Sequence, residues 1–218
     1  GLWSPTSVPV QISSTVPMAS SFMTDSPFLN AGAGRPAQHT PVWFMRQAGR
    51  SLPEYRELRG SGSILDAIAQ PELSAEITLQ PVRRHNVDAA VLFSDIVVPV
   101  HATGFGIDVT PGTGPVAEQP FRSRGDLQRL PPLTPEHVQH VTETVDILVT
   151  ELPASVPLLA FAGAPFTVAS YLIEGAPSRT YQHTKAMMHA EPQLWHDLME
   201  CLSDYAIEFI SAQLTHGA

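Results

Sequence analysis

The sequence has 218 residues, of which 43% are hydrophobic and 15% are charged, and its formal net charge is -9. A chain of this length can bury a core as one large domain or as two small ones. The acidic balance argues against nucleic acid as a general partner, because phosphate binding needs a basic surface.

A single cysteine, Cys201, excludes an intrachain disulfide and CxxC zinc sites. The nine histidines show no HxxxH or HxxEH spacing, so no metal site is expected. No apolar run approaches the length of a membrane span. Together these features predict a cytoplasmic protein that does not interact with membranes.

Residues 1–40 have the composition of a flexible leader. They are rich in Ser, Pro, Thr, Ala and Gly, and no charged residue precedes Asp25. They lack the basic start and the apolar segment of a secretory signal. We therefore expect the folded part to span residues 41–218.

An apolar run over residues 42–45 predicts a buried strand, and it ends at the segment Arg46-Gln47-Ala48-Gly49-Arg50. Arginine offers a planar fork of donors that pairs with carboxylates or phosphates in bidentate fashion. Ala48 and Gly49 leave room for a ligand to approach the backbone. The segment therefore looks like an anion-receiving loop.

Arginines cluster in the early part of the chain, at Arg35, Arg46, Arg50, Arg56 and Arg59. One local cluster in an acidic chain favours a specific anionic ligand. The alternative is that these arginines form ion pairs with Glu54 and Glu57 on a short helix.

Strand and helix signals alternate along the rest of the chain. Helices are expected over residues 53–59, 63–70, 71–84, 134–152 and 192–215, with a further helix after Pro165 that carries Tyr171. Strands are expected over residues 88–93, which end in Ser94-Asp95, and over residues 157–161, with a hairpin between residues 103 and 122. This order is typical of an α/β fold, the parallel (β/α)8 TIM barrel.

A complete barrel needs about 250 residues or more. The chain therefore looks like the amino-terminal half, or slightly more, of such a barrel. Three segments then give a specific resemblance: PVWFMRQAGRSLPEYRELR from residue 41, DAAVLFSDIVVP from residue 88, and FAGAPFTVASYLIEG from residue 161. In this order they resemble the uroporphyrinogen decarboxylase family, over residues 41–218.

The resemblance implies a TIM barrel, a homodimer when complete, and no cofactor. It also implies an anionic tetrapyrrole substrate, uroporphyrinogen III, whose four acetate side chains are decarboxylated to give coproporphyrinogen III in haem biosynthesis. The residues agree with this chemistry. Arginines can place carboxylates, and a carboxylate can stabilise a pyrrole that becomes positively charged.

The resemblance also assigns roles to residues. Asp95, Arg46 and Tyr171 would be catalytic. Substrate would bind to a larger set, which comprises Arg46, Gln47, Ala48, Gly49, Arg50, Arg59, Phe93, Ser94, Asp95 and Tyr171. Taken alone, Asp95 could equally cap a turn, and Tyr171 could be an ordinary half-buried tyrosine.

Two other hypotheses remain open from the sequence. One is a methyltransferase that shares the barrel, and whose zinc ligands would have to lie outside these residues. The other is a non-catalytic fragment that binds a tetrapyrrole or a partner.

We predict that residues 1–218 alone do not convert uroporphyrinogen and tend to aggregate, because an open sheet edge exposes unpaired backbone groups. Expression of this chain, a thermal unfolding scan and an assay for coproporphyrinogen test the prediction. A monomer that unfolds cooperatively and is active would show that the expected number of missing barrel units is wrong.

Overall fold

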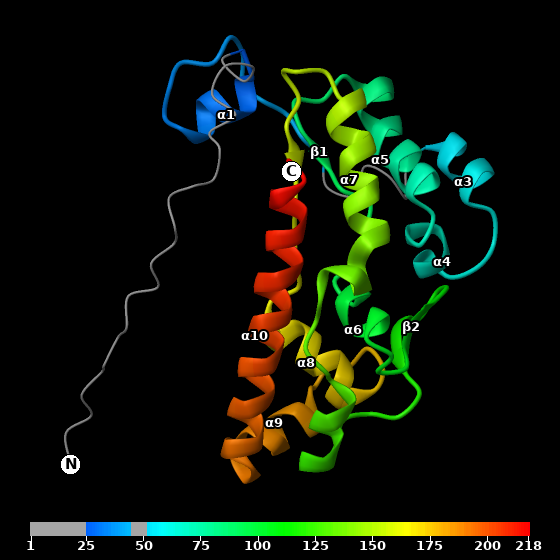
Figure 1. Cartoon of the computed structure of the whole chain (residues 1–218), viewed down its shortest axis with the longest axis vertical. Helices are drawn as coiled ribbons and strands as arrows, with labels where there is room; N and C mark the ends of the chain where they lie inside the picture. The colour runs from blue at the N-terminus through cyan, green and yellow to red at the C-terminus, as the bar shows by residue number, and fades with distance from the viewer. Residues whose placement is uncertain (1–24, 45–51) are drawn as a thin grey trace.

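The structure is a computed structural model that describes residues 25–44 and 52–218 (Figure 1). Within these residues it has two small sheets. The strands β1 (Ala90–Val91) and β4 (Leu158–Leu159) run parallel, with Ala90 opposite Leu158. The strands β2 (Ile107–Thr110) and β3 (Gly114–Ala117) form an antiparallel hairpin, as the sequence predicted.

Helices account for most of the described chain. Before β1 lie α1 (Pro27–Gly32), α3 (Pro53–Arg59), α4 (Ile64–Ile68) and α5 (Pro71–His85). Between β1 and β4 lie α6 (Val98–Ala102), the 3-10 helices η1 (Arg124–Arg129) and η2 (Pro135–Val138), and α7 (Gln139–Glu151). After β4 come α8 (Pro165–Glu174), α9 (Gln182–Ala190) and α10 (Pro192–Thr215).

Local sequence signals explain where these helices begin. The hydroxyls of Ser26 and Ser63 accept hydrogen bonds from the first turns of α1 and α4. Four other helices, α3, α5, α8 and α10, begin at a proline, whose missing N–H costs nothing in a first turn. The helix expected from residue 134 begins as the 3-10 helix η2 before it continues as α7.

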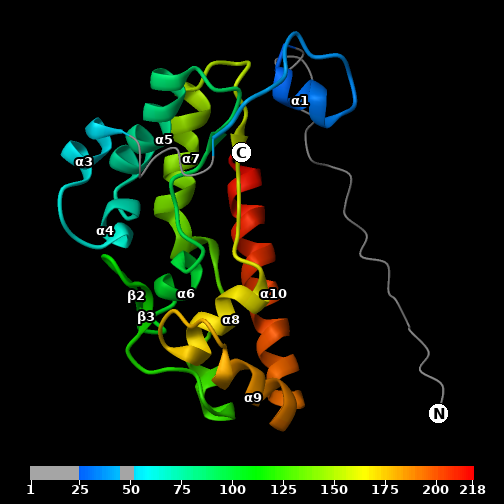
Figure 2. The ribbon, with the colours of Figure 1, turned by 180° about the vertical axis from the view of Figure 1, so that it is seen from behind.

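The parallel pair and its helices have the arrangement of a βα-barrel segment. The chain leaves β1 and returns to β4 through the hairpin and α7, which packs against α5. A parallel pair joined through a helix is the repeating unit of a (β/α)8 barrel. Figures 1 and 2 show α10 along the length of the molecule, with α8 and α9 at the end opposite β1.

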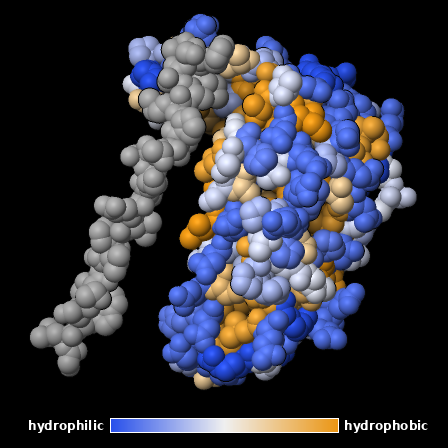
Figure 3. Space-filling view, viewed as in Figure 1, coloured by the Kyte–Doolittle hydropathy of each residue, from blue (hydrophilic) through white to orange (hydrophobic). Residues whose placement is uncertain are grey.

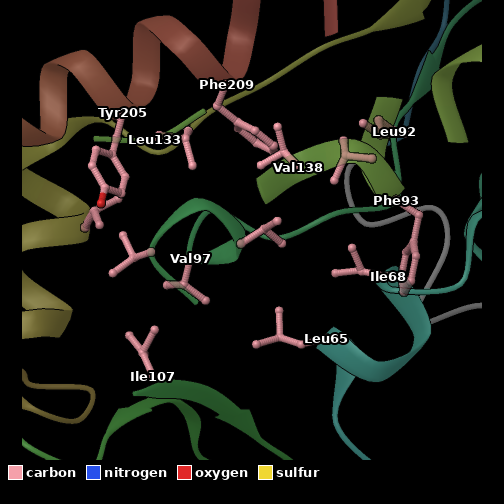
Figure 4. Close-up of a cluster of buried hydrophobic side chains, with 14 of the residues drawn as sticks. Leu65, Ile68, Leu92, Phe93, Val97, Ile107, Leu133, Val138, Tyr205 and Phe209 are labelled. Carbon is pink, nitrogen blue, oxygen red and sulfur yellow. The ribbon is translucent and has the colours of Figure 1, made fainter. Parts of the chain in front are cut away.

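The buried core extends over most of the described helices, and one part of it lies where the loop after β1 meets α4, β2 and α10. Figure 4 shows side chains from these elements directed toward one another, including Leu65, Val97, Ile107 and Phe209. The helix expected over residues 192–215 is confirmed as α10, and one of its faces is buried through Leu194, Leu198, Tyr205 and Phe209.

The sequence analysis expected a strand over residues 42–45, and the structure corrects this expectation for residues 42–44, which are the described part of that range. Residues 41–44 form no strand, and Val42, Trp43 and Phe44 are 40%, 37% and 56% exposed. A barrel strand is buried by a neighbour on each side. In the described chain, the backbone bond that this segment makes to a distant residue joins Asp88 N to Val42 O at 2.9 Å.

The expected leader includes one described element. The helix α1 lies inside it, and the side chain of Arg35 donates to Asn30 Oδ1 at 3.0 Å just after this helix. Residues 1–24 lie outside the described part of the chain, so the leader and its boundary at residue 40 stay predictions.

Among the described helices, none combines the length and apolar character needed to cross a bilayer. The face of the molecule drawn in Figure 3 intersperses hydrophobic residues among hydrophilic ones. The exposed large apolar side chains include Ile207, Ile210 and Leu214 on α10.

Candidate functional site

The candidate site is built on the loop that follows β1. In β1, Ala90 N donates to Pro157 O at 3.0 Å, and Leu92 N donates to Leu159 O at 3.3 Å. This ladder ends at Leu92, and the next residue, Phe93, takes its backbone partners from a helix. Two of the residues expected to be functional, Ser94 and Asp95, come directly after this change of partner.

Two hydroxyl side chains of α5 hold the backbone of Phe93. Ser74 Oγ donates to Phe93 O at 2.8 Å, and Phe93 N donates to Thr78 Oγ1 at 2.9 Å. Thr78 Oγ1 in turn donates to Ser74 O at 2.8 Å. Both hydroxyls are buried, so these bonds satisfy polar groups that water does not reach.

Asp95 is partly buried in this loop and is held by its own turn. Its Oδ1 accepts from Val97 N at 3.0 Å, and its backbone carbonyl accepts from Val98 N at 3.2 Å. Burial raises the pKa of the Asp95 carboxyl above its usual 3.8, and the backbone N–H groups of Val97 and Ile96 offset this only in part. A carboxylate that has lost water in this way favours an incoming N–H donor or positive charge.

Ser94 and Arg59 each have a buried polar atom without a partner. Among residues 25–44 and 52–218, Ser94 Oγ and Arg59 Nε find no hydrogen-bond partner, although another nitrogen of the same guanidinium, Arg59 Nη2, donates to Gly62 O at 2.8 Å. Such atoms are rare in folded proteins because an unpaired buried group costs about 1–3 kcal/mol.

Tyr55 connects Arg59 to this loop. Its ring packs edge-on against Phe93, with ring centroids 6.0 Å apart. Burial raises the pKa of the Tyr55 hydroxyl, and the positive charge of Arg59 nearby lowers it in part. Arg59 therefore lies on the Phe93 side of α3, and Tyr55 is a contact that the sequence analysis did not single out.

The second candidate loop follows β4 and is also held by a side chain. Gln213 of α10 is fully buried, and its amide brackets the backbone of Phe161. Gln213 Oε1 accepts from Phe161 N at 3.3 Å, and Gln213 Nε2 donates to Phe161 O at 3.1 Å. The ends of both parallel strands are thus fixed by helix side chains.

Gly163 brings the two loops into contact. A Cβ atom added at this residue would lie 2.6 Å from Val168 Cγ2 and 2.8 Å from Ile96 Cβ. Ile96 follows Asp95, and Val168 lies one turn before Tyr171 on α8. The close approach therefore packs the helix that carries Tyr171 against the loop that carries Asp95.

The structure places the predicted residues unevenly. Phe93, Ser94 and Asp95 share one loop, Arg59 lies one turn after Tyr55 on α3, and Tyr171 lies partly buried on α8. In residues 25–44 and 52–218, no hydrogen bond or ion pair joins Asp95 to Arg59 or Tyr171. The remaining predicted residues lie outside the described residues, and they are Arg46, Gln47, Ala48, Gly49 and Arg50.

The chain that leads into this arginine segment is anchored at Asp88. Asp88 Oδ2 accepts from Val42 N at 2.7 Å, and Asp88 Oδ1 lies 2.7 Å from His39 Nε2. Together with the bond from Asp88 N to Val42 O, these contacts fix residues 39–42 to the start of β1.

Sequence reasoning missed the residues that hold the loops rather than the residues that form them. Ser74 and Thr78 are spaced by four residues on α5, on the face that also buries Ile77. A pair of hydroxyls on a core-facing stripe is a usable signal, because a buried hydroxyl must find a partner. Gln213 gives a similar signal near the end of α10.

Within the described part of the chain, no three His, Cys, Asp or Glu side chains are placed to hold a metal ion. The two loops and the helices beside them carry a carboxylate, a guanidinium, hydroxyls and aromatic rings. Guanidinium groups are suited to pairing with anions, and a fixed carboxylate is suited to stabilising positive charge.

The family model and the curated relatives that match this chain agree on one family. The pattern of the family described as Uroporphyrinogen decarboxylase (URO-D) matches residues 23–218. A curated protein of that name from Streptomyces avermitilis is 56% identical over 194 residues, which cover 89% of this chain and 54% of the relative. Another of that name, from Corynebacterium efficiens, is 52% identical over 94% of this chain and 57% of the relative. The chain thus spans about half the length of the curated relatives it matches.

Among solved structures, a methyltransferase from Methanosarcina mazei has a TM-score of 0.66 and 22% sequence identity. The likeness covers 89% of this chain and 56% of that chain. At this identity the likeness shows the fold alone.

We predict that Gly163→Ala destabilises the protein by about 1–3 kcal/mol, because a new Cβ would clash with Ile96 and Val168. Chemical unfolding of the complete protein measures this change. The control is Gly32→Ala, where nothing lies within 4 Å of the new atom and the helix should gain stability. An equal effect at both positions would contradict the close approach of the two loops.

Proposed function

Because this chain belongs to the uroporphyrinogen decarboxylase family, whose fold is a TIM barrel, we propose that the complete protein decarboxylates uroporphyrinogen III. It removes CO₂ from the four acetate side chains and releases coproporphyrinogen III, without a cofactor. The observation that carries the proposal is the partly buried carboxylate of Asp95, held in the loop after a parallel strand.

The proposed chemistry uses the substrate as its own electron sink. A pyrrole that is protonated on a ring carbon accepts the electron pair of the C–COO⁻ bond as CO₂ leaves. A second proton then converts the side chain to a methyl group, and the ring proton is lost again. The positive charge on the pyrrole is stabilised by a fixed anion, and Asp95 takes this role by accepting from the pyrrole N–H groups.

Cationic groups place the carboxylates of the substrate in this proposal. Arg46 acts as a carboxylate clamp or as the proton donor, although its high pKa makes it a weak acid. Gln47, Arg50 and Arg59 hold peripheral carboxylates, and Ala48 and Gly49 allow the backbone to approach. Arg59 Nε is buried and has no partner among the described residues, which supports its part of this assignment.

The remaining groups shape the pocket. Phe93 and Ser94 lie beside Asp95, and Ser94 Oγ, which has no partner in the described part of the chain, pairs with a substrate carboxylate or pyrrole in this proposal. Tyr171 donates a hydrogen bond to the substrate. We also propose that the complete protein is a homodimer in the cytoplasm, which size-exclusion chromatography with light scattering and localisation of a tagged protein would test.

A methyltransferase is the second candidate, because a methyltransferase shares the fold. The 22% identity to that structure carries the fold only, whereas the curated relatives are 52% and 56% identical to this chain. Incubation of the complete protein with uroporphyrinogen, with and without a chelator, separates the two candidates. Coproporphyrinogen formed equally with and without the chelator would support the decarboxylase, and no conversion of uroporphyrinogen under either condition would count against it.

We predict that Asp95→Asn in the complete protein lowers kcat by about 100-fold or more, because the anion that stabilises the pyrrole is lost. The free energy of unfolding at neutral pH should be unchanged or higher. Because the pKa of Asp95 is raised in the folded protein, its ionisation lowers the free energy of unfolding at a pH above its usual pKa. Asparagine cannot ionise, so the substitution removes this loss. Near-normal turnover would exclude the proposed role.

Asp126→Asn is the matched control, because the pKa of Asp126 is lowered in the folded protein where that of Asp95 is raised. Burial acts to raise the pKa of Asp126, but hydrogen bonds from Arg122 N, Arg129 and Ser123 outweigh it and lower the pKa to about 2. The Asp126 carboxylate therefore adds stability that is lost as the pH falls toward 2. Its substitution should lower the free energy of unfolding at neutral pH and leave the kcat of folded enzyme unchanged.

We predict that Arg50→Lys raises the KM for uroporphyrinogen by about tenfold, because a point charge replaces a planar fork. Substrate binding by the wild-type protein should also weaken as the salt concentration rises. Arg35→Lys is the control, since Arg35 is exposed and contacts Asn30 beside α1. Equal kinetics for both variants would favour the interpretation of the arginine segment as a set of surface ion pairs.

A further inference from the structure

Ser74, Thr78 and Phe93 form a closed ring of hydrogen bonds at the end of β1. The two hydroxyls play different parts in it, since Ser74 Oγ donates to Phe93 O, while Thr78 Oγ1 accepts from Phe93 N and donates to Ser74 O. The three distances lie between 2.8 and 2.9 Å. We call these two side chains the hydroxyl clamp.

The clamp satisfies a peptide group that has no strand partner. The bond from Leu92 N to Leu159 O is the last of the β1–β4 ladder in the described chain. Phe93 is 8% exposed, and Ser74 and Thr78 are 1% and 3% exposed, so water cannot replace the missing neighbour. Loss of either hydroxyl would leave a buried backbone group unpaired.

The clamp is connected to Asp95 by a short and constrained piece of chain. Asp95 is two residues after Phe93, and its carboxylate is fixed on the other side by Val97 N. The ring of Phe93 is held independently against Tyr55. A shift of the Phe93 backbone would therefore move the Asp95 carboxylate relative to a bound ligand.

We propose that Ser74 and Thr78 are positioning residues that fix where the Asp95 carboxylate lies relative to the end of β1. The inference rests on the proposed function of Asp95. Neither hydroxyl needs to touch substrate, because both act through the backbone of Phe93. The hydroxyl clamp therefore adds two residues of α5 to those that determine the geometry of the proposed active site.

The test compares substitutions at two buried threonines of the complete protein, of which Thr78 bonds to the loop after β1 and Thr144 bonds within its own helix. Thr78→Val keeps the shape of the side chain and leaves Phe93 N unpaired, whereas Thr78→Ser keeps the hydroxyl. Thr144→Val is the control, because Thr144 is 1% exposed and its hydroxyl donates to His140 O at 2.8 Å within α7. That bond matches the one from Thr78 to Ser74 but has no link to the loop.

We expect Thr78→Val to lower kcat by up to about 100-fold with a much smaller change in KM, since a catalytic group misplaced by about 1 Å costs this much. Thr78→Ser should restore kcat, and Thr144→Val should leave it unchanged. Ser74→Ala is a milder second variant that should lower kcat in the same direction. A kcat for Thr78→Val no lower than that of Thr144→Val, or no rescue by serine, would overturn the proposal.

Amide hydrogen exchange of the peptide that contains Phe93 tests the clamp without an activity assay. Exchange there should be faster in Thr78→Val than in Thr144→Val or the wild type. If the wild-type protein fails to decarboxylate uroporphyrinogen, the proposed function is wrong, and this exchange comparison still decides whether the clamp holds the loop. Equal exchange in the two valine variants would show that it does not.

Discussion

The peptide group of Phe93 imposes the constraint on which the site depends. It is buried where the β1–β4 ladder ends, so its N–H and C=O must find partners other than a strand or water. Ser74 and Thr78 of α5 supply both partners. The helix before β1 therefore determines where the loop after β1 begins, and the position of Asp95 follows from that loop.

The loop after β4 repeats this solution with different chemistry. One amide, that of Gln213, replaces two hydroxyls and pairs both backbone groups of Phe161. Gly163 then allows the loop to approach Ile96 closely. Two strand ends are thus fixed by helices and packed on each other, so they can present polar groups with little freedom to move.

The electrostatics of the site follow from the same packing. Burial raises the pKa of Asp95 because its turn supplies only part of the hydrogen bonding that water would. Within the described part of the chain, Ser94 Oγ and Arg59 Nε are buried without partners. Unpaired groups of this kind cost stability in the free protein, and under the proposed function the N–H groups and carboxylates of the substrate would pair with them. A stable fold with such groups is what a preorganised binding site requires.

The sequence alone determined the family and most of the order of helices and strands, because these depend on local patterns, and it predicted a functional role for Asp95. Helix starts at Pro53, Pro71 and Pro192 and the hairpin could be predicted, since caps and turns are local. The tertiary structure decided what holds the loops. The clamp joins residues 19 apart, and the Gln213 bracket joins residues 52 apart, so no local pattern encodes either pairing. It also decided that residues 41–44 form no strand, because a strand requires neighbours that its own sequence cannot supply.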